Sequence, residues 1–436
     1  MTSSTLLSGG CVLTLGARTP NFETADVLLE DGLVVEVGRG LRARDAERVD
    51  ATDTIVMPGF VDTHRHAWTS LFRNAGGPGE DGPEVGAHFG PDDAYAATLI
   101  GLLGAAEAGI TTVVDWSDLP ADGGIAEAAL QAHVDAGLRS VFAHAAAGRN
   151  GEPAALDRAF VSRLADAAGP STAIAFGAPM TAGAATPAVD AAWATARELG
   201  LRIHAHGGSG RPSRGDIARL ADRGLLADDV TLVHCADLEV VDVDAIVASG
   251  AAISLAPSSE MAAGLGAPPI QQLVDRDIRP GLGVDAERVT PGDLFAQMRA
   301  TISVQHATVF DRKLAGKAGL PKLMSTRDVI RLATLEGARA IGLGRVAGSL
   351  EPGKQADVIV LRTDRPNVFP INDPIGAVVW GMDTSNVDAV FVGGRALMRD
   401  GDLTADVARA RSLATAARTR VAEAAGLVGA APGGDA

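Results

Sequence analysis

The chain has 436 residues, of which 47% are hydrophobic and 21% charged, so it is long enough for more than one domain and too apolar for a disordered protein. Its 54 acidic residues outnumber 38 basic ones, and the formal net charge of −16 argues against a surface for nucleic acid or anionic membranes. Only two cysteines occur, far apart in the sequence, which argues against a disulfide framework. Because no signal pattern and no membrane-length apolar run is found, we expect a protein of the cytoplasm.

Both ends of the chain are expected to form short strands joined by tight turns. Residues 25–38 are typical of a hairpin around Glu30-Asp31-Gly32, and strand-like runs return at 355–362 and 387–397. We therefore predict one small composite β-sandwich domain, formed by residues 1–57 and 346–402. Residues 403–436 are predicted to be a C-terminal helix and tail.

The part between these segments, residues 58–345, alternates apolar strand-like runs with stretches of helical spacing, such as 188–199 and 293–306. The continuous apolar runs are typical of buried parallel strands. The eight predicted strands are 59–66, 110–116, 139–147, 173–180, 201–207, 230–236, 251–257 and 280–286. This pattern predicts an α/β fold, a (β/α)8 TIM barrel, whose site lies at the carboxyl ends of its strands. An open doubly wound sheet is the alternative.

Histidines and one aspartate gather at four of these predicted strand ends. They are His64 and His66, His204 and His206, His234, and Asp285. Side chains alternate along a strand, so histidines two residues apart point the same way. Imidazole and carboxylate groups together suit one divalent ion such as Zn²⁺ or Fe²⁺. Each residue alone could be a buried histidine bonded to a carbonyl, or an aspartate capping a helix; their number favours a metal site.

A metal at this place would lower the pKa of a bound water and yield hydroxide near neutral pH. Asp285 could bind the ion and accept the proton of the water. His234 could orient that water or polarise the substrate.

The connection after the first strand, residues 74–83, is rich in glycine and proline, and we predict a lid over the mouth of the barrel. A surface excursion is the alternative. Candidate contacts to the substrate are Trp68, Phe72, His88 and Phe89 near this lid, and Trp116, Met180, Met261 and Gly264 elsewhere. Each of the last four could equally be packing.

The chain resembles the amidohydrolase superfamily, specifically the metal-dependent deaminase and chlorohydrolase branch that acts on triazines, purines and related heterocycles. The motifs that carry the resemblance are Pro58-Gly-Phe-Val-Asp-Thr-His64-Arg-His66, the histidine pair of the fifth strand, Val233-His234-Cys235, Gly283-Val-Asp285, 333–343 and 348–360. It implies a barrel with a composite β-sandwich and a homo-oligomer, such as a dimer. It also implies that the metal ligands are His64, His66, His206 and Asp285, with His234 beside substrate and water. His206 is preferred to His204, which is left to support the site or contact the substrate.

The lysines bear on the number of ions. Two-metal members of the superfamily commonly bridge their ions with a carboxylated lysine on a barrel strand. This chain has only Lys313, Lys317, Lys322 and Lys354, and none lies on a predicted strand. The fourth strand offers no glutamate or cysteine in its place. We therefore predict one ion.

One position departs from the pattern of the branch. Deaminases of this branch usually carry a proton-shuttling glutamate three residues after the ligand of the fifth strand, where this chain has Ser209, which we count among the candidate substrate contacts. Glu260, just past the seventh strand, is the candidate replacement as acid/base or substrate anchor. Its alternative is a solvated loop carboxylate.

Three functions follow, in order of preference. The first is deamination of a small nitrogen heterocycle by metal-hydroxide attack on an sp² ring carbon, with an atypical proton shuttle. The second is the opening of a cyclic amide or the displacement of halide, where protonation of a ring nitrogen matters less. The third is a barrel that binds a metal or ligand without catalysis.

Overall fold

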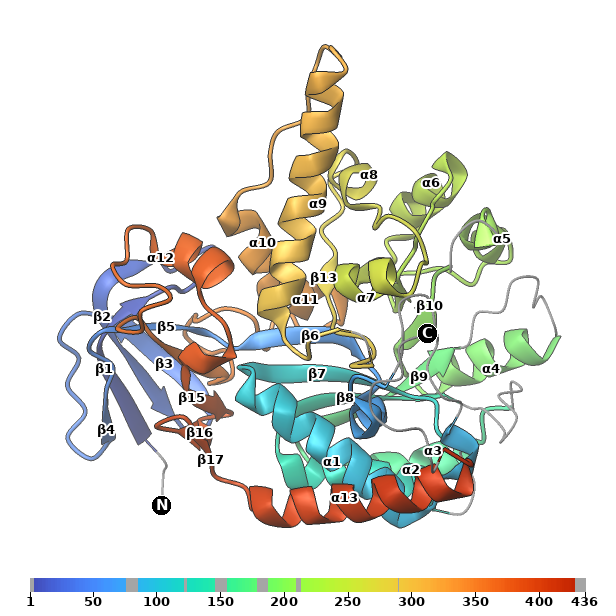
Figure 1. Cartoon of the computed structure of the whole chain (residues 1–436), viewed down its shortest axis with the longest axis horizontal. Helices are drawn as coiled ribbons and strands as arrows, with labels where there is room; N and C mark the ends of the chain where they lie inside the picture. The colour runs from blue at the N-terminus through green and yellow to red at the C-terminus, as the bar shows by residue number, and fades with distance from the viewer. Residues whose placement is uncertain are drawn as a thin grey trace.

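The computed structural model describes residues 4–75, 85–120, 124–145, 155–178, 187–208, 213–288 and 290–427. Two units are visible in Figure 1: a closed barrel of parallel strands surrounded by helices, and a separate sheet beside it. The predicted (β/α)8 barrel with a second unit built from both termini is therefore confirmed, and the open doubly wound sheet is wrong.

All eight predicted barrel strands are present, in sequence order around the barrel, and the last closes on the first. They are β6 (Phe60–Arg65), β7 (Ile110–Ser117), β8 (Arg139–Ala145), β9 (Thr172–Ala178), β10 (Ile203–His206), β11 (Val230–Val233), β12 (Ala252–Leu255) and β13 (Gly281–Leu282). Every residue of β7 is buried, because one face lines the barrel interior and the other lies under helices. That double burial is the reason the strands appear in the sequence as continuous apolar runs.

Helices follow the strands and cover the outside of the barrel (Figure 1). They are α1 (Pro91–Glu107), α2 (Ile125–Ala136), α3 (Arg158–Ala167), α4 (Pro187–Glu198), α5 (Asp216–Asp222), α6 (Val240–Ser249), α7 (Pro257–Ala262), α8 (Ile270–Val274), α9 (Leu294–Leu314), α10 (Thr326–Leu332) and α11 (Leu335–Ala340). The short α11 packs against β6, β12 and β13, and its Ala338 joins Val61 and Val114 in the barrel core. α11 thereby covers side chains of the barrel interior.

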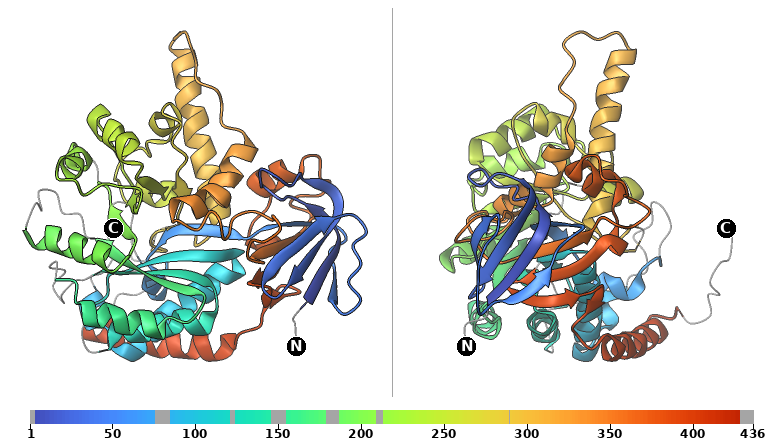
Figure 2. Two further views of the ribbon diagram at one scale, coloured as in Figure 1. Left: turned by 180° about the vertical axis from the view of Figure 1, so that it is seen from behind. Right: turned by 90° about the vertical axis from the view of Figure 1, so that its left-hand side faces the viewer.

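The second unit is a nine-stranded sheet that draws on both ends of the chain (Figure 2). Its strands are β1 (Ser4–Val12), β2 (Phe22–Glu30), β3 (Leu33–Gly38), β4 (Glu47–Asp50), β5 (Thr54–Pro58), β14 (Val358–Arg362), β15 (Val387–Val392), β16 (Arg395–Arg399) and β17 (Asp402–Leu403). β5 joins the two halves, because it pairs with β1 on one side and β14 on the other. Both halves contribute to one hydrophobic core. The predicted hairpin is β2 and β3, turning at Asp31 and Gly32, both with positive φ.

The predicted C-terminal helix is α13 (Val407–Ala424), which leaves the sheet and packs along α1. Arg420 Nε donates to Oδ1 of Asp93 at 2.9 Å, and Val421 is fully buried there. No helix in the described part of the chain is long and apolar enough to cross a membrane. The exact domain boundaries and the cytoplasmic location stay predictions.

Candidate active site at the mouth of the barrel

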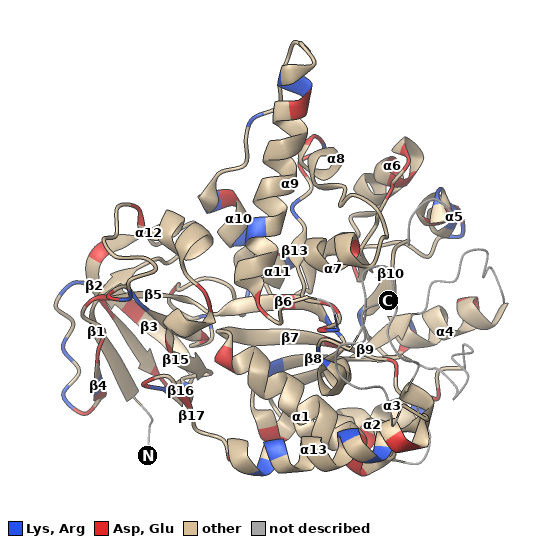
Figure 3. Ribbon diagram, viewed as in Figure 1, with Lys and Arg blue, Asp and Glu red and all other residues tan. Residues whose placement is uncertain are grey.

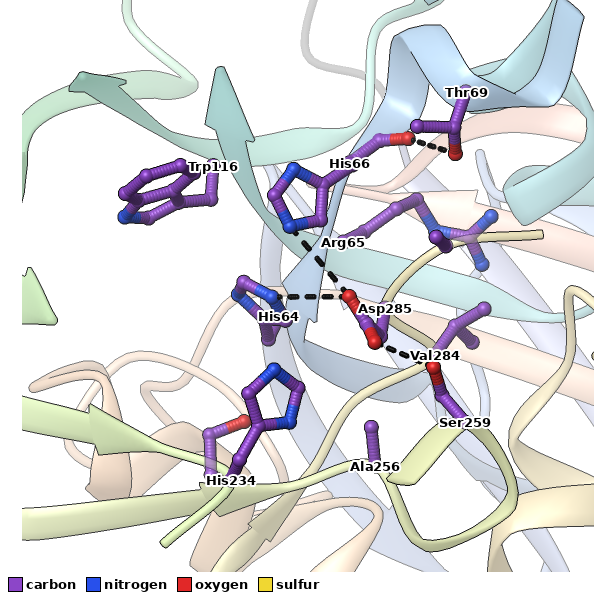
Figure 4. A network of polar contacts seen from close by, with 12 residues as sticks. His64, Arg65, His66, Thr69, Trp116, His234, Ala256, Ser259, Val284 and Asp285 are labelled. Atoms are coloured by element: carbon purple, nitrogen blue, oxygen red, sulfur yellow. Dashed lines mark hydrogen bonds and ion pairs between the residues drawn. The ribbon is translucent and has the colours of Figure 1, made fainter. Parts of the chain in front are cut away.

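Four histidines and one aspartate from the ends of four strands meet at one end of the barrel (Figure 4 shows His64, His66, His234 and Asp285). The ring of His64 is central: its centroid lies 4.9 Å from that of His66, 5.0 Å from that of His206 and 5.5 Å from that of His234. β6 carries His64, with His66 directly after it, and β10 ends at His206. Because the strands are parallel, their carboxyl ends meet at the same rim.

Asp285 lies between the first two histidines. Its Oδ1 is 3.3 Å from Nε2 of His64 and 3.5 Å from Nε2 of His66, while Oδ2 accepts a hydrogen bond from Ser259 Oγ at 2.5 Å (Figure 4). The backbone fixes this position: Asp285 N–H donates to the carbonyl of His64, and His66 N–H to that of Asp285. Asp285 has φ +66° and His234 has φ +67°. Left-handed backbone in non-glycine residues concentrates where function requires a set side-chain direction.

The electrostatics of these residues differ according to their neighbours. Burial lowers the pKa of His64 to about 4 and that of His206 well below its usual value, so both rings are neutral. Burial alone would also lower the pKa of His66, but Asp118 and Asp285 outweigh it and raise that pKa to about 9. Burial opposes ionisation of Asp285, yet the surrounding histidines hold its pKa well below the usual range. Asp285 is therefore a carboxylate.

The donor set fits a divalent cation. Among the described residues, two groups of three ligand atoms lie within 4.8 Å of one another: His64, His66 and His206, and His64, His234 and Asp285. Nδ1 of the fully buried His64 has no hydrogen-bond partner in the described part of the chain, and its Nε2 lies 3.3 Å from Oδ1 of Asp285 without forming a hydrogen bond. A buried imidazole without a partner is costly unless something else binds it. Neutral imidazoles with one carboxylate are the donors that Zn²⁺ and Fe²⁺ accept.

The structure excludes one of the two interpretations of Glu260. It belongs to α7 and is 0% exposed, so the alternative of a solvated loop carboxylate is wrong. Its Oε1 accepts the N–H of Ala256 at 2.7 Å and lies 3.3 Å from Nδ1 of His234. Burial raises the pKa of Glu260. Burial alone would lower the pKa of His234, but the contact with Glu260 acts against it and this pKa is raised. Glu260 therefore lies behind His234, not in the open mouth.

The residues predicted to contact a substrate are spread over several environments. Trp68 and Trp116 are buried near the histidines, and the ring of Trp116 lies 4.4 Å from that of His206. His88 is exposed on a short 3-10 helix (Gly86–His88). His204 is 0% exposed, and neither ring nitrogen has a partner among the described residues, which favours support of the site over direct substrate contact. Ser209, Met180 and most of the predicted lid lie outside the described residues.

Two polar residues were missed by sequence reasoning. Ser259 holds one oxygen of Asp285, and Asp118, directly after β7, contacts His66 and Trp68. The signal for Asp118 was a carboxylate immediately after a barrel strand, and the signal for Ser259 was its place beside Glu260.

A third missed feature lies on the side of β6 opposite His64 and His66. The buried Arg65 donates Nε–H to Asp62 Oδ2 at 2.8 Å and also pairs with Glu287, which bonds Ser70 and Arg73. This network ties the end of β6 to the segment after Asp285.

Comparisons with known proteins agree with this geometry. The sequence model of the amidohydrolase family matches residues 55–397. The 5′-deoxyadenosine deaminase of Methanothermobacter thermautotrophicus is 28% identical over 431 residues, covering 92% of this chain and 94% of that protein. The 5-methylthioadenosine/S-adenosylhomocysteine deaminase of Symbiobacterium thermophilum is 28% identical over 428 residues, covering 91% and 93%.

Two solved structures share the fold. A zinc-bound adenosine deaminase from Xanthomonas campestris superposes with a TM-score of 0.81 at 21% identity, covering 97% of this chain and 99% of that one. A zinc complex of atrazine chlorohydrolase from Arthrobacter aurescens superposes with a TM-score of 0.74 at 23% identity, covering 95% and 99%.

Proposed function

The chain belongs to the amidohydrolase family, and from this premise we propose that it is a mononuclear metal-dependent hydrolase that deaminates a small nitrogen heterocycle. The observation that carries the proposal is the convergence of His64, His66, His206, His234 and Asp285 around unpartnered imidazole nitrogens. The curated relatives are deaminases of adenine nucleosides, which makes such nucleosides the first substrates to test.

We propose that the ion is held by His64, His66, His206 and Asp285, with Zn²⁺ preferred to Fe²⁺. When bound, a divalent ion supplies a Lewis acid and an activated water. Both ligand groups share His64, which supports one ion. Among the lysines, Lys354 donates to the carbonyls of Gly344 and Ala347 in the link from α11 to β14, away from the histidines.

In the proposed reaction Asp285, His234 and Glu260 have separate roles. Asp285 Oδ2 is held by Ser259, so its Oδ1, which faces Nε2 of His64 and of His66, is the oxygen placed for the ion and for a proton from the attacking water. Nδ1 of His234 faces Glu260, and the other ring nitrogen is turned toward Asp285 and His64 (Figure 4). The raised pKa of His234 favours its imidazolium form, in which Nδ1–H bonds Glu260 and Nε2–H can donate to the substrate where negative charge develops. Glu260 acts through His234, so in this proposal it is a positioning residue.

A second candidate is hydrolysis that needs no ring protonation, such as opening a cyclic amide or displacing halide. The observation that favours it is the position of Glu260, whose carboxylate is bonded to Nδ1 of His234 and to the N–H of Ala256 and is therefore engaged behind His234. A barrel that binds metal without catalysis is the third candidate. The ordered contacts of Asp285 and His234 count against it.

The test is metal analysis together with a substrate panel. The purified chain, supplied with Zn²⁺ and separately with Fe²⁺, should retain about one ion per chain. Aminated heterocycles, adenine nucleosides among them, should release ammonia; cyclic amides are followed by absorbance and chlorinated triazines by halide. Ammonia from none of the aminated compounds, with turnover of a cyclic amide or chlorinated ring, would shift the assignment to the second candidate. A fully metallated chain inactive on all three classes would support the third.

We also propose that the chain forms a homodimer through the free end of α9. α9 projects from the body of the molecule (Figure 1), and Phe310 and Leu314 there are 44% and 88% exposed. Lys313 lies in the last turn of α9, Lys317 and Lys322 follow within nine residues, and Lys/Arg colour marks the tip of this helix in Figure 3. In a two-fold dimer built on this arm, the exposed Phe310 and Leu314 of each copy supply the apolar contact.

A further inference from the structure

We propose that Asp118 is a positioning residue that holds a candidate metal ligand and a side chain of the mouth with one carboxylate oxygen. Oδ1 of Asp118 lies 3.2 Å from Nδ1 of His66 and 2.5 Å from Nε1 of Trp68. The inference rests on the proposed function, because it needs His66 to bind the ion.

The chemistry of the two donors determines which ring nitrogen of His66 carries hydrogen when it faces Asp118. The indole nitrogen can only donate, and an ionised carboxylate can only accept, so Oδ1 of Asp118 is the acceptor in both contacts. Nδ1 of His66 therefore carries hydrogen, and when the ring gives up its second proton, as metal binding requires, the lone pair belongs to Nε2. Nε2 is the nitrogen that lies 3.5 Å from Oδ1 of Asp285, on the side of the candidate ion. A carboxylate behind a ligating imidazole fixes its tautomer and increases its donor strength.

The second contact ties the ligand to the mouth of the barrel. Trp68 belongs to the 3-10 helix Ala67–Phe72, is 6% exposed, and packs edge-on against Phe89 with ring centroids 5.3 Å apart. The guanidinium of Arg288 lies 5.5 Å from the Trp68 ring centroid, so the indole links segments that follow β6 and β13. Without Asp118 the buried indole N–H loses its acceptor.

The side chain of Asp118 itself is 34% exposed, against 11% for His66. The carboxylate therefore lies on the more open side of the ligand cluster. Asp118 thus sets both the metal affinity and the position of Trp68, whereas an ordinary ion pair on the protein surface would set neither. We expect the two properties to change together when Asp118 is altered.

The experiment compares Asp118→Ala, Asp118→Asn and Trp68→Phe in the full chain. Zn²⁺ affinity is measured by competition with a chromophoric chelator, and exposure of Trp68 by acrylamide quenching of tryptophan fluorescence. Asp118→Ala should weaken Zn²⁺ binding by about 10–100-fold and add a quenchable component that the double variant Asp118→Ala/Trp68→Phe lacks. Asp118→Asn keeps an acceptor oxygen and should recover part of both. Trp68→Phe alone leaves His66 and Asp118 in contact and should leave Zn²⁺ affinity nearly unchanged.

The outcomes separate this inference from the proposed function. A wild-type chain that retains no ion overturns both. A wild-type chain that binds Zn²⁺ while folded Asp118→Ala binds it equally well, with unchanged quenching, overturns only the role of Asp118. If the alanine variant does not fold, the nearly isosteric asparagine variant decides: Zn²⁺ affinity and quenching both equal to wild type would reject the role.

Discussion

Glu260 lies directly behind His234, with its Oε1 3.3 Å from Nδ1 of the imidazole and 2.7 Å from the amide nitrogen of Ala256. This one buried oxygen thus accepts the backbone N–H of the residue before helix α7 and also orients a histidine of the candidate site. The carboxylate predicted to replace the missing proton carrier is engaged on the far side of His234. In the proposed mechanism the effect of Glu260 on turnover therefore passes through the ring of His234.

Replacing Glu260 tests this relationship. In Glu260→Ala the N–H of His234 becomes a buried donor without an acceptor, at a cost of about 1–3 kcal/mol, so turnover should fall by about 10–100-fold. Glu260→Gln keeps an acceptor oxygen and should lose less. The measurement is kcat together with metal content, which should stay at the wild-type level in both variants. Wild-type turnover in folded, metallated Glu260→Ala would show that the contact is only structural.

The central histidine should control metal binding. His64→Ala removes the ring shared by both ligand groups, so the chain should lose its ion and its turnover should fall by at least about two orders of magnitude. Mass-spectrometric metal analysis after gel filtration measures the loss. His88→Ala is the matched control, because His88 is exposed on the 3-10 helix before α1. Full metal content in His64→Ala would contradict the proposed ligand set.

The position of Ser209 can be tested by restoring the usual residue. Ser209→Glu places a carboxylate three residues after His206, where deaminases of this branch carry their proton shuttle. We expect release of ammonia from aminated heterocycles to rise about tenfold or more, since general acid–base catalysis contributes about 10²–10⁴-fold in enzymes. Ser209→Gln, which cannot transfer a proton, is the control. An equal gain in both variants would point to substrate binding instead.

A histidine away from the candidate site should shape the pH dependence of stability. His144 packs against Phe160 of α3, and burial lowers its pKa to about 4. The unfolded chain binds a proton at an ordinary pKa of about 6.5, so between pH 6.5 and 4 protonation favours unfolding. The contribution is fully present above pH 6.5, and about 3 kcal/mol is lost on acidification to pH 4.

The variant His144→Leu removes this titration. Its free energy of unfolding, measured by urea denaturation, should fall less steeply than that of the wild type between pH 6.5 and 4. The difference between the two curves isolates His144 from the carboxylates that also titrate. Parallel curves would mean that His144 gains a proton as easily in the folded chain as in the unfolded one.

The arm of α9 gives a test of the oligomeric state. Leu314→Glu places a charge on the most exposed apolar side chain of the arm and should raise the dissociation constant of the dimer at least about tenfold. Sedimentation velocity over a concentration series measures it. Val247→Glu on α6, a half-exposed apolar position elsewhere, is the control. A wild-type chain that sediments as a monomer throughout, or a Leu314→Glu variant that associates normally, would reject the arm as the interface.

Much of the fold was accessible from the sequence because its signals are local. Strands such as β7 are buried on both faces, so their apolar runs are continuous and easy to recognise. The pair His64 and His66 shares a face because strand side chains alternate, a rule that needs no tertiary contact. The strand ends were less accurate: β13 has only two residues where seven were predicted, since backbone pairing with β12 and β6, not residue type, decides where a strand stops.

The sequence by itself determined the barrel, the sheet shared by both termini, and histidines and an aspartate at the correct strand ends. Only the tertiary structure decided what stands behind them. Asp118 meets His66 across 52 residues, and Glu260 meets His234 across 26. Composition and spacing cannot foresee such contacts, because they depend on how neighbouring barrel strands bring distant loops together. The relative position of His64 and His66 is fixed by one strand. The side chains that contact the histidines from behind are brought there only when the whole barrel closes.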